Sequence, residues 1–261
     1  MKLSIITINY NNKAGLQRTI NSVLAQTSKD FEWILIDGGS TDGSKDLLDE
    51  YSDYFDCYVS EPDCGIYNAM NKGIRLSHGE YLQFLNSGDS LHDNDTIEKV
   101  LPLLLNVDIY VGRINSIGKV NNCFDEQGDF SPEGIIRKLT FTWIPHQASF
   151  IRRDSFTSFG FYREDKKIVS DWWFYFQALV IGSATISPIH ITVADYDTTG
   201  VSSVNRQEAA QEQESLLKEH YVISEYYHFY KDNKEIIQAI KGNRIAFWLF
   251  RVYFFLYRKF H

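Results

Sequence analysis

The sequence predicts an α/β protein: a mostly parallel sheet with helices on both faces, followed by a helical extension at the C-terminus. Two patterns carry this prediction. Over residues 1–112, short β-prone apolar runs alternate with amphipathic helical segments, which is typical of repeated strand–helix–strand units. From Asn205 onward, helical patterning continues through most of the remaining chain. The length of 261 residues suits one large domain, or one domain with an appendage.

The elements of the first half follow in close succession. A buried strand over residues 3–9 precedes an amphipathic helix over 13–26, whose apolar positions recur at helical spacing. The elements after it are a strand over 31–36, a helix to about residue 54, a strand near 57–60, a helix over 66–77, a strand over 80–85, a helix over 94–105 and a strand over 108–112.

The regular alternation breaks after Gly112. Residues 113–145 are irregular, with some helix near 132–139. We expect a strand over 146–152, an aromatic-rich helix over 170–181, a strand or strand pair over 184–195, and helices from residue 205 that are interrupted near 231–233.

Charge and cysteine content restrict the function classes. The net charge is −8, yet the segment from Lys231 onward carries seven Lys and Arg against two acidic residues, so the rest of the chain has a net charge of −13. Such an acidic body argues against nucleic acid as a partner. Three cysteines without metal-ligand spacing indicate a reducing compartment. The first residues read as a strand rather than a signal peptide.

Three polar clusters follow buried strands: residues 9–12 (Asn-Tyr-Asn-Asn), 37–40 (Asp-Gly-Gly-Ser) and 86–89 (Asn-Ser-Gly-Asp). Each cluster alone is more typical of a turn. Because parallel strands end at one sheet edge, where α/β proteins bind ligands, the three together favour a nucleotide site. Tyr10 would stack on the base, and Asp37 would accept a base N–H. Asp89 would hold a divalent metal on a diphosphate.

Three further clusters are candidates for the rest of a site. His146 and Gln147 enter a strand after the irregular stretch, although a lone histidine is more often structural. Asp171 is either a helix N-cap residue or a general base, with Trp172 and Trp173 as a wall that stacks on sugars. Residues 198–203 form a glycine-containing loop that either folds over a ligand or simply turns.

These motifs, in this order, resemble family 2 glycosyltransferases with the GT-A fold, over residues 1 to about 204. The resemblance rests on Ser4-Ile5-Ile6-Thr7-Ile8-Asn9-Tyr10-Asn11, Ile36-Asp37-Gly38-Gly39-Ser40-Thr41-Asp42-Gly43, Asp63-Cys64-Gly65-Ile66-Tyr67-Asn68-Ala69-Met70-Asn71-Lys72-Gly73, Gly79 to Asp89, His146-Gln147, Ser170-Asp171 and Gly200-Val201-Ser202. It implies a nucleotide-diphospho-sugar donor, a divalent Mg²⁺ or Mn²⁺ and inversion at the anomeric carbon. It also implies a nucleotide-binding half over 1–112, an acceptor half over 113–204 and separate helices over 205–261.

The resemblance assigns roles to individual residues. Asp89 would be the metal ligand and Asp171 the catalytic base. The donor nucleotide would be bound by Thr7, Asn9, Tyr10, Asp37, Gly38, Asn71 and Asn86. The acceptor or the diphosphate would be contacted by His146, Gln147, Trp172, Trp173, Gly200 and Ser202.

Two positions depart from the family pattern. Asn86 stands where Asp is common, so the metal motif retains only its last carboxylate and would bind metal weakly. Met70 stands where many relatives have an arginine before Asn71, so that donor contact is expected to be missing.

The predicted function is transfer of a sugar from a UDP-sugar to a glycan or lipid-linked acceptor hydroxyl. The transition state has oxocarbenium character, and a base must take the proton of the attacking hydroxyl. Two alternatives remain open. One is a nucleotide- or carbohydrate-binding module without catalysis. The other is a nucleotidyltransferase, although that class typically needs a Gly-rich, basic loop after its first strand, and residues 9–12 lack this pattern.

The C-terminal segment has its own pattern. Residues 241–261 carry five basic residues and no acidic one, with Arg244, Arg251 and Arg258 spaced seven apart among many aromatics. This pattern predicts an interfacial helix on anionic lipid rather than a membrane span. The alternative is a helix packed on the main domain or on another subunit of a homo-oligomer. Together with this segment, the resemblance to family 2 glycosyltransferases implies a location in the cytoplasm, peripherally on the inner face of a bacterial cell membrane.

Overall fold

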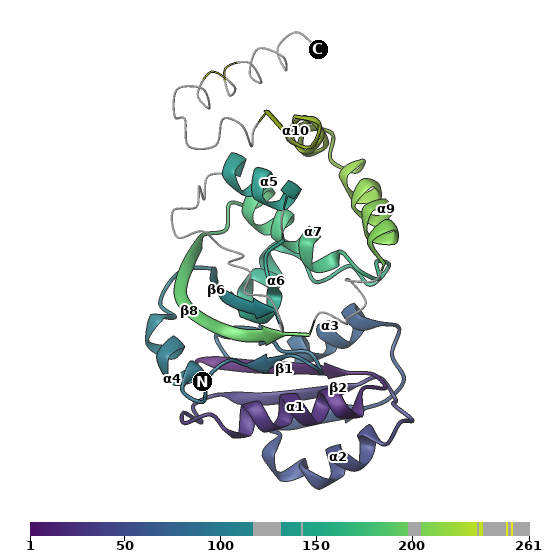
Figure 1. The fold of residues 1–261 in the computed structure, drawn as a ribbon, viewed down its shortest axis with the longest axis vertical. Coiled ribbons are helices and arrows are strands. Elements are labelled where there is room, and N and C mark those ends of the chain that lie inside the picture. The colour runs from purple at the N-terminus through teal and green to yellow at the C-terminus, as the bar shows by residue number, and fades with distance from the viewer. Residues whose placement is uncertain are drawn as a thin grey trace.

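The strands of the computed structural model form one curled sheet (Figure 1). The structure describes residues 1–116, 132–141, 143–197 and 205–233, together with 235, 236, 249 and 252. Within these residues the sheet has eight strands in the order β3-β2-β1-β4-β7-β6-β8-β5. Their bounds are β1 (Leu3–Asn9), β2 (Glu32–Asp37), β3 (Cys57–Ser60), β4 (Tyr81–Phe84), β5 (Ser90–Leu91), β6 (Ile109–Ser116), β7 (Ser149–Arg152) and β8 (Ile186–Tyr196).

The helices occupy most of the connections between strands. The α-helices are α1 (Lys13–Leu24), α2 (Ser44–Glu50), α3 (Ile66–Leu76), α4 (Thr96–Val100), α5 (Pro132–Phe141), α6 (Arg153–Phe159), α7 (Ser170–Phe176), α9 (Arg206–Leu217) and α10 (Tyr221–Asp232). The shorter helical turns are η1 (Ser52–Tyr54), η2 (Leu101–Leu103), η3 (His146–Ala148) and the π-helical η4 (Gln177–Ile181). Helix α6 and the short strand β5 are elements that the sequence patterns did not predict.

Parallel pairing sets the register of the strands in the first half of the chain. Strands β3, β2, β1 and β4 are parallel neighbours, and the partners Asn9, Asp37 and Ser60 lie at matching positions at the ends of β1, β2 and β3. Strand β7 runs antiparallel to β4 and β6, while β6 and β8 are parallel. The mixed α/β architecture confirms the predicted fold class.

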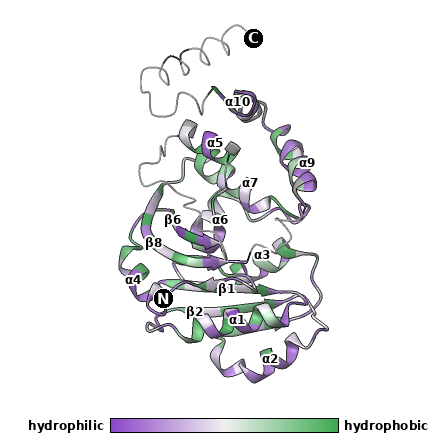
Figure 2. Cartoon of the chain, viewed as in Figure 1, coloured by the Kyte–Doolittle hydropathy of each residue, from purple (hydrophilic) through white to green (hydrophobic). Residues whose placement is uncertain are grey.

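Two hydrophobic clusters cover the two faces of the sheet. Along β1, Ile6 and Ile8 face one cluster, while Leu3 and Ile5 face the other, as the two-residue period of a strand requires. Helices α1, α2 and α4 cover the second cluster, and α3, α5 and α7 cover the first. Figure 2 shows hydrophobic and hydrophilic residues alternating along α1 and α2, which is the pattern of helices with one face on the sheet.

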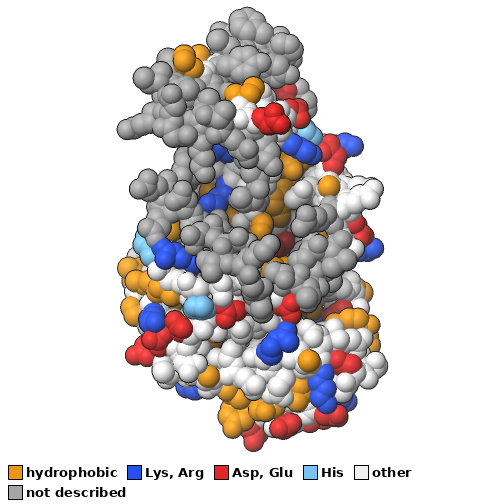
Figure 3. All heavy atoms as spheres, in the orientation of Figure 1, with side chains coloured by type: hydrophobic (Ala, Val, Ile, Leu, Met, Phe, Trp, Pro, Cys, Tyr) orange, Lys and Arg blue, Asp and Glu red, His pale blue; other side chains and the backbone are white. Residues whose placement is uncertain are grey.

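Helices α9 and α10 pack against the body of the protein. Leu216 and Leu217 of α9, with Tyr227 and Phe229 of α10, are buried in the same cluster as α5 and α7. On the face shown in Figure 3, acidic and basic side chains of the described residues are interspersed over the lower half of the molecule. Within the part of the chain that the structure describes, no helix has the length and hydrophobicity to cross a bilayer. The predicted interfacial helix over 241–261 lies outside the described residues, apart from positions 249 and 252.

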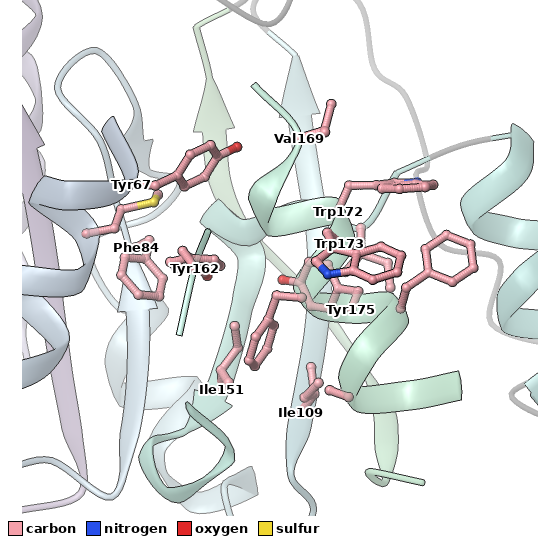
Figure 4. Close-up of a cluster of buried hydrophobic side chains, with 14 of the residues drawn as sticks. Tyr67, Phe84, Ile109, Ile151, Tyr162, Val169, Trp172, Trp173 and Tyr175 are labelled. Carbon is pink, nitrogen blue, oxygen red and sulfur yellow. The ribbon is translucent and has the colours of Figure 1, made fainter. Parts of the chain in front are cut away.

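The predicted sugar-stacking wall is wrong, because both tryptophans belong to the core. Trp172 and Trp173 are 6% and 1% exposed, and Figure 4 shows them among the buried side chains of α7 and its neighbours. The indole N–H of Trp172 donates to the carbonyl of Leu139 at 2.9 Å, and its ring packs on Phe176. Helix α7 is covered by α5 and by the C-terminal helices, so its aromatic positions fill space between helices.

Candidate active site

A cavity of about 880 Å³ opens at the carboxyl edge of the parallel strands. Its walls come from the segments that follow β1, β2, β4 and β8, from η3, and from the starts of α3 and α7. The predicted site residues that line it are Asn9, Tyr10, Gly38, Asn86, Asp89, His146, Gln147 and Asp171. The strand topology therefore brings together most of the side chains that sequence patterns placed in one site. Pockets of this size accommodate drug-sized or larger ligands.

Asp37 anchors the turn after β2 rather than lining the cavity. Its side chain is fully buried. Its two oxygens accept hydrogen bonds from the side chains of Asn9, Ser40 and Ser60 and from the backbone N–H groups of residues 39 and 40. Burial opposes ionisation, but these donors outweigh it and hold the pKa of Asp37 below its usual range. The predicted direct contact with a nucleotide base is therefore not a feature of this arrangement.

Gly38 and Tyr10 form the wall beside that turn. A Cβ at position 38 would lie 2.5 Å from a carboxylate oxygen of Asp63 and 3.2 Å from the Tyr10 ring, so a larger residue there would require the Asp63 side chain to move. The Tyr10 side chain is 65% exposed although it is aromatic. An exposed ring at the edge of a cavity is suited to stacking on a flat ligand.

Side chains of α1 and its N-cap hold the loop after β4. The amide of Asn12 donates to the carbonyl of Ser87 at 3.0 Å, and the Thr19 hydroxyl donates to the carbonyl of Asp89 at 2.7 Å. The same hydroxyl accepts the N–H of Gly88 at 3.1 Å, and Gly88 has φ of +109°, a conformation that favours glycine. The loop thereby fixes the direction of Asp89.

Asp89 is a buried carboxylate with an elevated pKa. It is 4% exposed, and its Oδ1 accepts the backbone N–H of Asp197 at 3.1 Å. Burial is the main cause that raises its pKa, to about 6, and the nearby charge of Asp197 adds to it, while His146 acts in the opposite direction. A cation beside Asp89 would compensate for the unfavourable burial of this charge.

Asp171 is held by two side chains from other elements. Its Oδ2 lies 3.1 Å from Nδ1 of His146 in η3, and its Oδ1 lies 2.8 Å from the hydroxyl of Tyr67 in α3. Figure 4 shows the Tyr67 hydroxyl pointing from the core toward the start of α7. Burial works against ionisation of Asp171, but the hydrogen bond and charge of His146, with the Tyr67 hydroxyl, keep its pKa below the usual range. Asp171 is therefore an ionised carboxylate on the cavity wall at neutral pH.

Two predicted nucleotide contacts lie away from the cavity. Thr7 is fully buried within β1, where its hydroxyl accepts the indole N–H of Trp33 at 3.0 Å. Asn71 is buried in α3, where its amide pairs with both the N–H and the carbonyl of Tyr162. Both side chains are committed to internal hydrogen bonds, so their predicted contacts with the nucleotide have no support in this arrangement. Gly200 and Ser202 lie outside the described residues.

Several residues that line or support the cavity were not predicted as site residues from the sequence. Asp197 and Tyr196 line the cavity just after β8, and Tyr67 supports Asp171 from α3. Ser60, at the end of β3, completes the hydrogen bonds of Asp37. Tyr67 stands in the stretch that resembles the family, but its contact with Asp171 joins positions 104 residues apart. Only the folded chain reveals such a contact.

The donor set near Asp89 fits a hard divalent cation. Asp89 and Asp197 contribute carboxylates to the same cavity wall, and one oxygen of Asp197 accepts from Arg18 at 2.7 Å, which leaves its other oxygen for an ion. Among the described residues, no group of three or more His, Cys, Asp or Glu side chains is placed to hold an ion. Mg²⁺ is commonly bound by one or two carboxylates together with substrate phosphates, so two carboxylates suit an ion that arrives with a diphosphate.

The chain is similar to known glycosyltransferases. The family model described as Glycosyl transferase family 2 matches residues 4–171. A PGL/p-HBAD biosynthesis glycosyltransferase of Mycobacterium bovis is 32% identical over 203 residues, which cover 76% of this chain and 77% of that protein.

Two solved structures share the fold. S. aureus TarS 1–349 in complex with UDP-GlcNAc matches with a TM-score of 0.62 and 18% identity, over 76% of this chain and 58% of that chain. The mannosyltransferase PcManGT of Pyrobaculum calidifontis, in complex with GDP-Man and Mn²⁺, matches with a TM-score of 0.61 and 14% identity, over 96% of this chain and 79% of that chain.

The elevated pKa of Asp89 predicts a pH-dependent stability penalty in metal-free protein. The folded protein keeps the Asp89 proton up to a pH of about 6, whereas the unfolded chain releases it near the ordinary aspartate pKa of 3.8. The free energy of unfolding should therefore fall as pH rises through this window. Asp89→Asn removes the penalty, and urea unfolding in EDTA should find the variant more stable by about 3 kcal/mol at pH 7.5, with the difference shrinking toward pH 4.5.

The exposed Asp154 on α6 provides the control. Asp154→Asn should leave the difference from the parent protein flat across this pH range. An Asp89→Asn difference that is equally flat would show that burial does not raise the pKa of Asp89.

Proposed function

The chain belongs to glycosyl transferase family 2, and we propose that it transfers a sugar from a UDP-sugar to a glycan or lipid-linked hydroxyl with inversion. One observation carries the proposal: Asp171, an ionised carboxylate held by His146 and Tyr67, shares a cavity with Asp89. Asp171 is the base that accepts the proton of the acceptor hydroxyl. Asp89 lies where the donor diphosphate binds.

The donor nucleotide occupies the side of the cavity between β1 and β2. Tyr10, whose ring is exposed, stacks on the base, and Gly38 and Gly39 line the cavity beside it. Asp37 contributes to nucleotide binding indirectly, because it anchors the turn that carries Gly38. The solved TarS complex contains UDP-GlcNAc and the PcManGT complex contains GDP-Man, so both support a nucleotide-sugar donor. UDP is our choice between the two, by analogy with TarS.

Asp89 and Asp197 would hold the divalent ion that the family implies. When bound, such an ion neutralises the negative charge that develops on the leaving diphosphate. The protein's own contribution is to present Asp89 from a loop fixed by Asn12 and Thr19, and Asp197 from the segment after β8, whose backbone N–H donates to Asp89. In this arrangement the two anionic ligands are Asp89 and Asp197, so no aspartate is needed at position 86.

Asp171 acts as the general base. An acceptor hydroxyl is a weak nucleophile, and its oxygen attacks the anomeric carbon as the bond to the diphosphate oxygen breaks. Asp171 receives the hydroxyl proton. Its oxygens accept from the side chains of His146 and Tyr67, and a carboxylate has further lone pairs that can take that proton. A single displacement of this kind inverts the configuration of the anomeric carbon.

Trp143 and Tyr196 form the acceptor platform in place of the buried Trp172 and Trp173. Trp143 is 38% exposed, and its ring lies 5.6 Å from that of Tyr196, which lines the cavity. The segment that begins at Trp143 continues directly into η3 with His146. Tyr196 and Asp171 line the same cavity, and Trp143 packs on Tyr196, so the apolar face of a sugar ring can pack on this pair.

Peripheral membrane association through residues 241–261 remains part of the proposal. It rests on the basic and aromatic pattern of that segment. A lipid-linked acceptor would then be presented to the enzyme at the membrane surface.

Replacement of the base should separate chemistry from binding. Asp171→Asn keeps the shape of the side chain but cannot accept the proton, so turnover should fall by about 100-fold or more, while UDP affinity changes less than about threefold. Release of UDP from a panel of UDP-sugars with Mn²⁺ measures turnover, and calorimetry measures UDP binding. Asp154→Asn is the matched control. Near-normal turnover of Asp171→Asn would refute the assignment, and UDP binding without turnover by the parent protein would favour a binding module.

Removal of the Asp89 carboxylate should abolish the effect of the metal on UDP affinity. In the parent protein, Mn²⁺ should tighten UDP binding at pH 7.5, because Asp89 would hold the ion and the ion would supply positive charge to the diphosphate. Calorimetric titrations of Asp89→Asn with UDP should give the same affinity with Mn²⁺ as with EDTA. A variant that keeps the full metal enhancement would exclude Asp89 as a ligand.

Loss of the exposed Trp143 indole should weaken binding of the acceptor and leave binding of the donor unchanged. Trp143→Ala should raise the acceptor KM by roughly 10-fold, because a sugar–aromatic contact contributes about 1 kcal/mol or more, and leave the UDP-sugar KM unchanged. Steady-state kinetics with an acceptor identified by screening provides the test. Tyr54→Ala removes a 59% exposed ring outside the residues that line the cavity, and it should change neither KM. An altered donor KM in Trp143→Ala would place the indole on the other substrate.

A further inference from the structure

A carboxylate of the C-terminal extension holds the backbone of the segment that leads into α7. Glu212 of α9 accepts the N–H of Lys167 at 2.7 Å on Oε1, and the N–H groups of Ile168 and Val169 at 3.0 and 3.3 Å on Oε2. Ile168 and Val169 are buried, so a loss of this partner would leave backbone donors unpaired away from water. One side chain therefore fixes the path of three consecutive residues.

Those residues connect directly to the proposed base. Val169 immediately precedes α7, whose second residue is Asp171. The carbonyl of Ile168 accepts from the Tyr67 hydroxyl at 2.6 Å, and the same hydroxyl lies 2.8 Å from Oδ1 of Asp171. Ile168 thus contacts Glu212 through its N–H and the hydroxyl that supports Asp171 through its carbonyl.

We propose that Glu212 is a positioning residue for Asp171, and that α9 is therefore part of the catalytic unit. The inference rests on the proposed role of Asp171 as the base. Proton transfer requires the carboxylate to lie within hydrogen-bond reach of the acceptor hydroxyl, and a displacement of about 1 Å can reduce the rate by about 100-fold. Glu212 limits such a displacement because it holds the backbone from which α7 starts.

The other contacts between α9 and this segment reach side chains rather than the backbone. One guanidinium nitrogen of Arg163 lies 2.9 and 2.7 Å from the two carboxylate oxygens of Glu219, and Nζ of Lys166 donates to the Ser215 hydroxyl at 3.0 Å. These contacts are exposed, and exposed ion pairs add little to stability. They attach α9 to the segment without fixing residues 167–169, so they provide a control.

Helix α9 should stay in place when Glu212 is replaced. Leu216 and Leu217, one turn further along the helix, are fully buried in the core cluster that also contains Trp172. Their burial, rather than the Glu212 carboxylate, supplies the hydrophobic attachment of the helix. A substitution at position 212 therefore changes the backbone contact and keeps the packing.

The test is turnover per UDP-binding site in Glu212→Ala. Calorimetric titration with UDP and Mn²⁺ counts the sites, so that misfolded protein does not lower the value. Turnover per site should fall roughly 10-fold, with the UDP-sugar KM unchanged within about twofold. Glu219→Ala removes a contact between the C-terminal extension and the same segment, and it should stay within about twofold of the parent. Parent-like turnover of Glu212→Ala, or an equal loss in Glu219→Ala, would overturn the proposal.

A double variant separates positioning from a general disturbance of the site. If Glu212 acts through Asp171, then Asp171→Asn has already lost what Glu212 contributes, and Asp171→Asn/Glu212→Ala should turn over within about twofold of Asp171→Asn. A further loss as large as that of Glu212→Ala alone would contradict the positioning role. If instead Asp171→Asn is as active as the parent, the proposed base itself fails, and that outcome is distinct from a failure confined to Glu212.

Glu212→Gln keeps the test decisive if Glu212→Ala gives no protein that binds UDP. The glutamine carbonyl can accept two of the three N–H groups, whereas its amide nitrogen cannot accept the third. Turnover per site of Glu212→Gln should therefore fall by a smaller factor, roughly 3-fold, and the fall should again vanish in the Asp171→Asn background. With Glu212→Ala unable to fold, parent-like turnover of Glu212→Gln would overturn the proposal.

Discussion

The site depends on the in-register parallel pairing of β1, β2 and β3. This pairing places Asn9, Asp37 and Ser60 side by side at one sheet edge, where Asp37 gathers hydrogen bonds from both neighbours. A register shift by one residue would turn every side chain of a strand to the opposite face and would separate these groups. The two hydrophobic clusters prevent that shift, because each strand alternates between them. The core thus determines where the cavity lies.

The same cavity gives two carboxylates opposite properties. Asp89 is deeply buried near a second carboxylate, and its pKa is raised to about 6. Asp171 lies on the wall of the same cavity, where burial again opposes ionisation, yet His146 and Tyr67 keep its pKa low. Such a separation of neighbouring acids is how enzymes assign different roles to chemically identical groups. One carboxylate is suited to share a cation with a diphosphate, and the other is ready to accept a proton.

Features that depend on local sequence patterns could be predicted from the sequence. Burial and contacts that depend on segments far apart in the chain could not. The strands, the polar clusters at their ends and the positions of Asp89 and Asp171 followed from periodicity and from family motifs. The burial of Trp172 and Trp173 did not, because helices that lie before and after α7 in the sequence cover it. Thr7, Asn71 and Asp37 are polar residues of strands, helices and turns whose hydrogen bonds are internal. The contact of Trp143 with Tyr196, and that of Tyr67 with Asp171, likewise form only on folding.

The anomeric configuration of the product tests the central claim most directly. If Asp171 removes a proton while the acceptor attacks in a single displacement, a donor with an α-linked sugar must give a β-linked product, as read from its NMR coupling constants. A product that retains the α configuration would contradict the account, because retention by two successive displacements requires a nucleophile on the protein rather than a base.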